Sequence, residues 1–321
     1  MNQIKIAIID TGLNENIYHY KNIIGKRHFY IKNSCIYMND DVFDYNGHGT
    51  SCAEIISRHC QSCMLYIIKI TQGNMRTTYS CLLIEALNYL LNVDVDIINI
   101  SMSLRCEENR EEMEVLLQQL RDQNKIIVVS VVNGEKQSYP ANSEYCIGVR
   151  AEFEYDYNYS YSNYNKVQIV CNMFPELVLN SNYKYYWFSG NSKETAFVSA
   201  LIGNIIHDND KKDLDSLLTL GKVKINNAKK PKWNEKDYFV FEKMEFLFFE
   251  YIEGYDGDEN YVVLSSDSMK LVEIDEFLGE IENLFEIRID RDKILFEDFY
   301  SVTCIVKMVT GSLRSNSNHV Q

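Results

Sequence analysis

The sequence predicts an α/β fold in which helices cover both faces of a parallel sheet, followed by a small, acidic and mainly helical domain. Short apolar runs alternate with longer segments whose apolar residues recur every three or four positions, which indicates a βαβ series. Acidic residues are concentrated near the C-terminus. Of the 321 residues, 46% are hydrophobic and 24% are charged, a composition that excludes wholesale disorder.

Five near-continuous apolar runs predict buried parallel strands, because strands covered on both faces do not alternate polar and apolar residues. These runs are residues 4–10, 63–70, 95–102, 125–132 and 145–151. Two segments between them, 78–92 and 107–123, have the apolar spacing of covering helices. Residues 152–165 are rich in Tyr and Asn, and we interpret them as a surface loop or an edge strand.

The distribution of charge predicts two domains. The formal net charge is −14, and residues 232–321 contribute −11 of it, from 20 Asp/Glu and 9 Lys/Arg. A basic, polar segment with Pro231 precedes this region and is typical of a linker. We therefore expect domains at 1–231 and 232–321. Because no run of Lys and Arg accompanies the acidic balance, nucleic acid is not an expected partner.

The N-terminal and cysteine patterns favour a cytoplasmic protein. The apolar run from Ile6 to Ile9 ends at Asp10, which is too short for the roughly 7 to 15 apolar residues of a secretory signal. No stretch approaches the roughly 18 apolar residues of a membrane helix, so no membrane partner is expected. Nine cysteines without framework spacing suit a reducing compartment. We interpret the lone CxxC of Cys60 and Cys63 as a coincidence of buried small residues rather than a metal or redox site.

Three short segments carry residue types used in catalysis. Asp10 follows a buried strand, at the edge where open α/β sheets keep their active sites. His48 lies between two glycines at the start of a predicted helix, and Ser192 stands at the head of an apolar helix. Each has a simpler explanation when taken alone: Asp10 could end a strand, and His48 and Ser192 could cap helices. Their order along the chain suggests a joint role.

Together these segments resemble the subtilisin-like serine proteases over about residues 4–207. The sequences Asp10-Thr11-Gly12 and His48-Gly49-Thr50 match the family's D-T/S-G and H-G-T motifs, and Ser192 follows in the family's order. Asn133, after a buried strand and before Gly134, occupies the place of the family's oxyanion asparagine. The resemblance implies a subtilisin-like parallel sheet.

The resemblance also implies a role for each residue. Ser192 would attack the peptide carbonyl while His48 takes its proton, and Asp10 would orient the imidazole. Asn133 would donate a hydrogen bond to the oxyanion. The substrate would lie along the strand edge whose residues are Ser101, Met102 and Ser103. This chemistry requires no cofactor and implies no catalytic metal, and it leaves calcium binding unassigned.

Two departures from the family pattern bear on function. The family's nucleophile motif is G-T-S-M-A-x-P, whereas residues 190–196 read GNSKETA. Ser103 and Leu104 replace glycines that leave room for bound side chains, which predicts a narrowed specificity pocket. We therefore expect a serine endopeptidase that processes one or a few defined peptides, for example a ribosomally made precursor. The alternative is a subtilase fold that has lost turnover and binds peptides or docks a biosynthetic partner.

The acidic segment has amphipathic helical spacing and faintly resembles an acyl or peptidyl carrier protein. Asp267-Ser268-Met269 would correspond to the carrier's phosphopantetheine site, but the distance from Ser268 to Phe285 is about three residues too long. A degenerate carrier-like or unrelated helical domain is therefore favoured, and phosphopantetheine is not expected at Ser268. This domain is a candidate docking surface for a protein partner.

Overall fold

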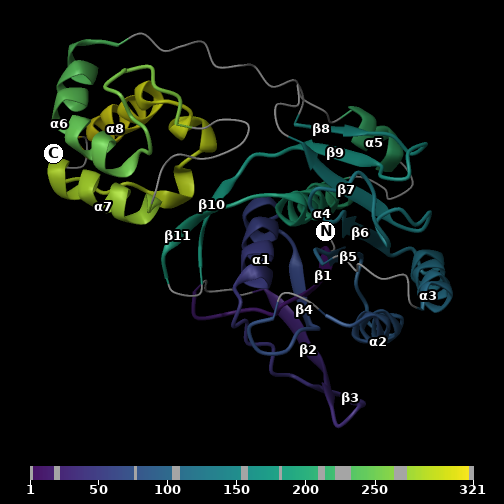
Figure 1. The fold of residues 1–321 in the computed structure, drawn as a ribbon. Coiled ribbons are helices and arrows are strands. Elements are labelled where there is room, and N and C mark those ends of the chain that lie inside the picture. Colours follow the sequence, from purple (N-terminus) through teal and green to yellow (C-terminus); the bar gives the residue numbers. More distant parts are fainter. Residues whose placement is uncertain are drawn as a thin grey trace. The chain divides into compact units, whose positions relative to one another are not determined.

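The computed structural model describes residues 3–17, 22–75, 78–102, 109–152, 158–180, 183–208, 214–220, 233–263 and 273–317 (Figure 1). The chain forms two compact units. The first comprises Met1–Met173, Leu179–Tyr183 and Ser189–Ile225, and the second comprises Phe174–Val178, Lys184–Phe188 and Asn226–Gln321. The predicted boundary at residue 231 lies outside the described residues and stays a prediction. The sequence did not indicate that residues 174–178 and 184–188 belong with the C-terminal unit.

The first unit is built on a nine-stranded sheet of order β3-β2-β4-β1-β5-β6-β7-β9-β8. The strands are β1 Lys5–Asp10, β2 Ile23–Lys32, β3 Cys35–Asn39, β4 Met64–Lys69, β5 Ile97–Ile100, β6 Ile126–Ser130, β7 Ile147–Glu152, β8 Tyr159–Tyr161 and β9 Ile169–Asn172. Neighbours from β2 through β9 pair in parallel, and only the edge strands β3 and β8 pair antiparallel. All five predicted strands are confirmed, and β8 is the edge strand expected within 152–165.

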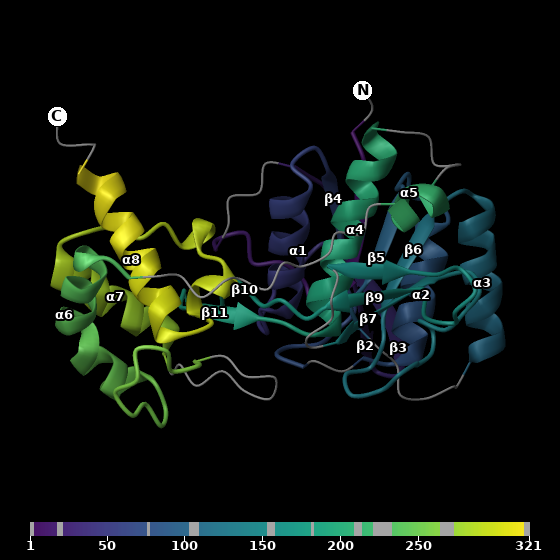
Figure 2. The ribbon, with the colours of Figure 1, turned by 90° about the horizontal axis from the view of Figure 1, so that it is seen from above.

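Helices cover both faces of this sheet, as the sequence predicts. They are α1 His48–His59, α2 Ser80–Leu90, α3 Arg110–Asp122, α4 Asn191–Asp208 and α5 Leu214–Leu220. Ala7 and Ile9 of β1 pack in the core cluster that also contains α2 and α3 residues, whereas Ile6 lies beside Gly203 of α4. Successive strand residues point to opposite faces, so α4 and its neighbour α1 cover the face opposite α2 and α3 (Figure 2).

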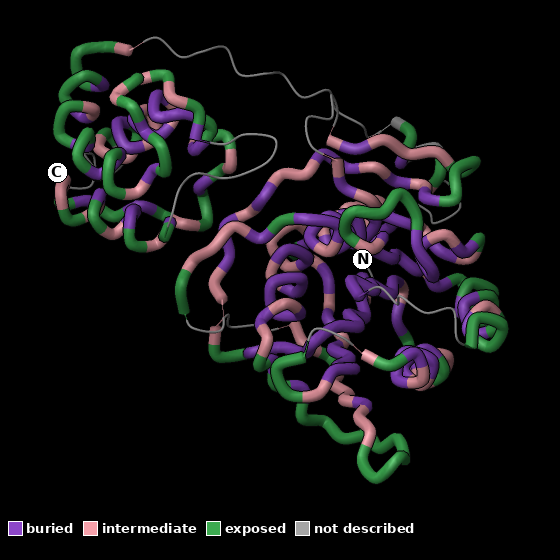
Figure 3. The backbone as a smooth tube through the Cα atoms, viewed as in Figure 1, coloured by how far each residue is buried: buried purple, intermediate pink, exposed green. Residues whose placement is uncertain are grey.

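The core of the first unit follows from the apolar runs. Ile6, Ile8 and Ile9 of the central strand β1 are at most 1% exposed, and the tube of Figure 3 is coloured buried through this region. The register of β1 sets Asp10 opposite Lys69 at the carboxyl end of β4. The first polar residue after the apolar run is therefore delivered to the carboxyl edge of the sheet.

The second unit has its own hydrophobic core. Its elements are the hairpin β10 Glu176–Leu179 and β11 Tyr185–Phe188, the helices α6 Glu235–Tyr251, α7 Ile274–Phe285 and α8 Val302–Ser317, and short 3-10 turns at Arg291–Lys293 and Phe296–Phe299. Phe248, Phe277 and Phe299 are fully buried in this core. The mainly helical character is confirmed. Asp267, Ser268 and Met269 lie outside the described residues, so the carrier-like resemblance stays a prediction.

Within the described ranges, none of the helices combines the length and apolar character needed to cross a bilayer.

Candidate active site

Asp10 is held at the carboxyl end of β1 with its side chain 1% exposed. Its Oδ1 accepts a hydrogen bond from the backbone N–H of Thr11 at 2.7 Å. The next residue, Gly12, has φ +121°, and a Cβ there would come within 2.2 Å of the Val42 carbonyl oxygen. A side chain at position 12 is therefore excluded both by backbone conformation and by space.

His48 opens α1 and contacts Asp10. The distance between His48 Nδ1 and Asp10 Oδ1 is 2.7 Å. This approach depends on Gly49, because a Cβ there would lie 2.4 Å from the carbonyl oxygen of Gly12. The hydroxyl of Thr11 also accepts a hydrogen bond from the Gly49 N–H at 2.8 Å. The two predicted motifs are therefore in direct contact, through the Gly12 backbone and the Thr11 hydroxyl.

The environment of His48 favours its protonated form. Burial alone would lower the pKa of His48, but the charge of Asp10 and the hydrogen bond to it outweigh burial and hold this pKa well above the ordinary value of 6.5. A histidine paired in this way gains proton affinity while its second ring nitrogen stays on the side away from the carboxylate. In its neutral form the imidazole therefore has a raised affinity for a proton from a neighbouring hydroxyl.

Asp44 fixes the loop that leads into His48 and was missed by the sequence analysis. Its fully buried carboxylate accepts hydrogen bonds from the backbone N–H groups of Asn46, Gly47 and Thr50 at 3.0, 2.9 and 2.9 Å, and from the Thr50 hydroxyl at 2.8 Å. The bond to the Thr50 N–H satisfies one of the first donors of α1, which have no partner within the helix, and the bonds to Asn46 and Gly47 fix the turn before it. The sequence signal that could have indicated this role is the position of Asp44, three residues before Gly47, which precedes the first residue of α1.

Ser192 lies in the first turn of α4, after Gly190 with φ +97°. Its hydroxyl donates to the Ser101 carbonyl oxygen at 2.9 Å, and the Ser101 hydroxyl donates to the Ser192 carbonyl oxygen at 3.3 Å. Ser101 therefore joins the end of β5 to the predicted nucleophile.

Cys52 links the two halves of the site and was also missed. It lies one turn after His48 on α1, the spacing that puts two side chains on one face of a helix, with its Sγ 4.0 Å from His48 Nδ1. Burial raises the pKa of the Cys52 thiol to about 11, while hydrogen bonding with Ser101 opposes this shift. A continuous set of contacts thus runs from Asp10 through His48, Cys52 and Ser101 to Ser192.

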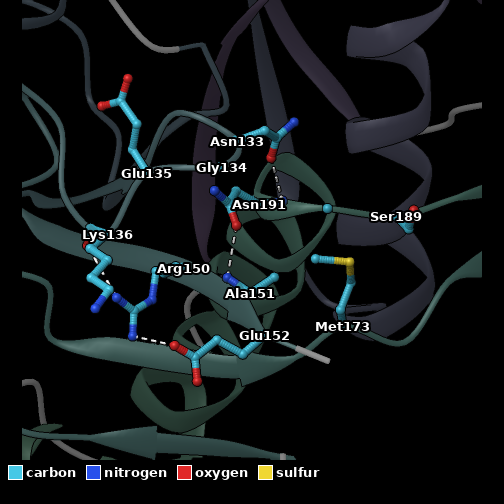
Figure 4. Close-up of a pocket in the computed structure, with 11 residues that line it drawn as sticks. Asn133, Gly134, Glu135, Lys136, Arg150, Ala151, Glu152, Met173, Ser189 and Asn191 are labelled. Atoms are coloured by element: carbon cyan, nitrogen blue, oxygen red, sulfur yellow. Dashed lines mark hydrogen bonds and ion pairs between the residues drawn. The ribbon is translucent and has the colours of Figure 1, made fainter. Parts of the chain in front are cut away.

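Asn133 lies beside the backbone that precedes Ser192. Its Oδ1 accepts a hydrogen bond from the Asn191 N–H at 3.3 Å, and it flanks Gly190 (Figure 4). The Asn191 side chain is itself buried: it accepts from the Ala151 N–H and donates to the Val131 carbonyl, both at 2.8 Å. Asn191, which replaces the family's Thr, therefore ties the head of α4 to the ends of β6 and β7.

A pocket of about 420 Å³ opens next to Asn133. It is lined by Asn133, Gly134, Glu135, Lys136, Arg150, Ala151, Glu152, Met173, Ser189, Gly190 and Asn191 (Figure 4). Arg150 is paired with Glu152 on its wall and donates to the Lys136 carbonyl at 3.3 Å. Its walls therefore place one ion pair beside a lining that is mostly apolar.

The predicted substrate edge is only partly described. Ser101 and Met102 are 4% and 7% exposed, and Met102 packs in the main core cluster, whereas Ser103 and Leu104 lie outside the described residues. A peptide contacting Ser101 and Met102 must use their backbone groups, because their side chains are committed to the interior. The substrate role of this segment stays a prediction.

A buried ion pair follows the predicted nucleophile. Lys193 and Glu194 are 3% and 2% exposed, with Nζ and Oε1 3.2 Å apart, and the Lys193 ammonium lies 5.3 Å from the ring centroid of Phe197. These residues stand where the family motif has Met and Ala. The two departures compensate each other, because burying either charge without a partner is costly.

One group of described residues could hold a metal ion. Asp10, His48 and Cys52 offer atoms within 4.8 Å of one another, the one such group among the described residues, and a metal bound there would take the groups needed for proton transfer.

The eight described cysteines are all free. Cys60 and Cys63 are both buried, and a hydrogen bond from Cys63 lowers the pKa of the Cys60 thiol to about 7. Their interpretation as a structural coincidence stays a prediction.

Comparison with known proteins supports the resemblance. The model of the subtilase family matches residues 1–238. The major intracellular serine protease of Bacillus subtilis (strain 168) is 28% identical over 220 residues, which cover 63% of this chain and 68% of that protein. The human membrane-bound transcription factor site-1 protease is 29% identical over 106 residues, covering 31% of this chain and 9% of that protein. A cold-adapted subtilisin-like serine proteinase overlays with a TM-score of 0.53 at 16% identity, covering 67% and 81% of the two chains, and this likeness shows the fold.

The buried pair of Lys193 and Glu194 predicts a strong coupling in stability. Lys193→Met or Glu194→Ala alone should lower the free energy of unfolding by about 3 kcal/mol or more, because each leaves the other charge buried. The double variant should recover most of this loss. Urea unfolding of the three variants tests the coupling, with Lys26→Met, which breaks an exposed pair with Glu15, as a control that changes stability by less than about 1 kcal/mol. Additive losses in the double variant would contradict the coupling.

The Asp10–His48 contact predicts a titration above the ordinary range. Protonated His48 stabilises the fold fully below pH 6.5, and this stabilisation is lost as pH rises through its raised folded-state pKa. Asp10→Asn should lower the pKa of His48, because burial remains while the charge of Asp10 is gone. NMR of the ring protons against pH measures this, and His28, whose pKa is lowered by burial, should be unaffected. An unchanged His48 titration in Asp10→Asn would refute the assignment.

Proposed function

Because the chain belongs to the subtilase family and is therefore a serine-type endopeptidase, we propose that Asp10, His48 and Ser192 are its catalytic triad and that it processes defined peptides in the cytoplasm. The observation that carries this proposal is the 2.7 Å contact between Asp10 and His48 in a network that reaches Ser192. The eight free cysteines support a reducing compartment.

In the proposed mechanism His48 acts as general base. Its contact through Nδ1 leaves Nε2 to accept the Ser192 proton as Oγ attacks the peptide carbonyl. The hydroxyl must first turn away from the Ser101 carbonyl to which it donates. His48 then gives the proton to the leaving amine, and a water molecule releases the acyl group by the same steps in reverse order.

The proposed oxyanion hole combines a side chain and a backbone group. The Oδ1 of Asn133 is engaged by the Asn191 N–H, so its Nδ2 is turned outward as a donor. The Ser192 N–H belongs to the first turn of α4, where backbone donors lack partners within the helix. Two such donors stabilise the negative oxygen of the tetrahedral intermediate more than the neutral carbonyl of the substrate.

The pocket beside Asn133 supports selective rather than general proteolysis. Arg150 and Glu152 on its wall form an ion pair beside a mostly apolar lining, so a substrate side chain that fills the pocket must suit both kinds of surface. Together with Ser103 and Leu104 in place of family glycines, this favours cleavage of one or a few sequences, such as a ribosomally made precursor peptide. The acidic C-terminal unit is the proposed docking part.

A second candidate is a peptide-binding protein with little turnover. The observation that favours it is the hydrogen bond from the Ser192 hydroxyl to the Ser101 carbonyl, which holds the nucleophile in a non-attacking arrangement. Breaking one neutral hydrogen bond costs about 1 kcal/mol, which substrate binding readily supplies. We therefore favour the active enzyme.

Labelling with a fluorophosphonate probe distinguishes the two candidates. Wild-type protein should be labelled at Ser192, since the probe reports a serine activated by its base, and Ser192→Ala should abolish labelling and peptide cleavage. Ser162→Ala, just after β8 and outside the pocket lining, serves as the matched control and should retain both. Folded wild-type protein that takes up no probe and cleaves no peptide library would establish the binding-protein alternative.

The oxyanion role of Asn133 predicts a selective loss in kcat. Asn133→Ala should lower kcat by about 10² to 10³ with little change in KM, because its hydrogen bond strengthens only as the oxyanion forms. Gln137→Ala, an exposed residue on the same loop, should leave both constants near wild type. Steady-state kinetics on a cleaved peptide provide the measurement. The reverse pattern, with the loss in Gln137→Ala, would show that the oxyanion hole is misplaced.

A further inference from the structure

Helix α6 exposes a set of large aromatic side chains. Tyr238, Phe239, Phe246 and Phe249 are 50, 54, 56 and 58% exposed. We call these four residues the α6 aromatic face. Figure 3 colours much of α6 as exposed. Scattered apolar residues are normal on a surface, but four aromatic rings on one helix are typical of an interaction site.

The core of the second unit does not need this face. Val240, Met244, Leu247 and Phe248 of the same helix are the buried residues that pack against α7 and α8. At 100° per residue, the α6 aromatic face spans an arc of about 100° centred nearly opposite those four residues. The helix therefore carries apolar residues on two sides, and the side opposite the aromatic face makes most of the core packing.

Neighbouring groups hold parts of the α6 aromatic face in place. The Lys243 ammonium lies 4.9 Å from the ring centroid of Phe239. Phe249 packs edge-on against Tyr255 with centroids 4.8 Å apart, and Tyr255 is itself buried. Ordered aromatic rings can anchor a partner at a low cost in side-chain entropy.

The charged residues on α6 favour a partner of positive charge. Four exposed glutamates accompany the aromatic rings: Glu235 and Glu242 lie within their arc, and Glu245 and Glu250 lie about 20° beyond its two ends. The two lysines, Lys236 and Lys243, lie together at one edge of that arc. The face therefore offers apolar rings interleaved with negative charge.

We propose that the α6 aromatic face docks a basic, amphipathic helical segment of the peptide substrate. Apolar residues on one side of such a helix would cover the rings while its Lys and Arg residues meet the glutamates. Anionic membranes and nucleic acids carry the wrong charge for this surface. A second copy would bring the same glutamates face to face in a symmetric interface, which like-charge repulsion opposes.

This inference rests on the proposed function for the identity of the occupant as substrate. Its test needs no turnover, because binding is measured with Ser192→Ala protein. Failure of docking and failure of peptide hydrolysis are therefore separate results.

The probe is a fluorescein-labelled peptide made only of Leu and Lys, with Leu at helical spacing, and the readout is fluorescence anisotropy. A peptide of the same composition in scrambled order carries the same charge without an apolar face. The helical peptide should bind at least about tenfold more tightly than the scrambled one, and added salt should weaken binding. Equal binding of the two peptides would overturn the proposal, since charge alone would then explain it.

Variants locate the binding to α6. Phe246→Gln with Phe249→Gln should weaken binding at least about tenfold, whereas Leu295→Gln, a 61% exposed residue of the same unit, should not. Glu242→Gln with Glu245→Gln should weaken binding and reduce its salt dependence, and Glu297→Gln is the matched control. This charge variant keeps the test decisive even where the aromatic variant fails to fold. Unchanged binding in the α6 variants, or a dimer of the protein that the aromatic variant abolishes, would overturn the proposal.

Discussion

The site depends on the contact of two glycine-bearing backbone segments. A Cβ at Gly49 would lie 2.4 Å from the Gly12 carbonyl oxygen, so the start of α1 can approach the end of β1 only if position 49 has no side chain. This approach sets Asp10 and His48 2.7 Å apart. Gly12 is constrained as well, by φ +121° and by the Val42 carbonyl. The electrostatic environment that raises the pKa of His48 therefore follows from a steric requirement on the backbone.

The head of α4 shows how a departure from a family motif can be accommodated. Asn191 uses its whole amide, accepting from the Ala151 N–H and donating to the Val131 carbonyl, and its own N–H meets Asn133. Lys193 and Glu194 neutralise each other in the interior. Each replacement satisfies its polar groups locally, as buried polar groups require. Ser192 consequently stays at the start of the helix although its neighbours differ from the family's.

Sequence patterns predicted the strands that are buried on both faces and missed β2 and β3, which are not. The central strands are apolar throughout, so β1, β4, β5, β6 and β7 were found from their runs alone. Strand β3 is exposed along its whole length and β2 carries charged residues, so neither shows a run. The motifs identified Asp10, His48 and Ser192, whereas Asp44 and Cys52 act through contacts between residues that carry no catalytic motif. Membership of β10 and β11 in the second unit depends on tertiary packing, which spacing along the chain does not encode.

Most of the net negative charge lies in the C-terminal part of the chain. Residues 232–321 contribute −11 to a net charge of −14, so residues 1–231 carry only −3. Under the proposed function, this stretch attracts or repels peptides only weakly by long-range charge, and selectivity comes from short-range contacts such as those at the Arg150–Glu152 pair. Long-range attraction is then left to the acidic unit, where it acts over about a Debye length of 8 to 10 Å and favours cationic segments. A substrate that carries a basic segment apart from its cleavage site would bind to both units, whereas a short peptide without that segment would bind only to the first.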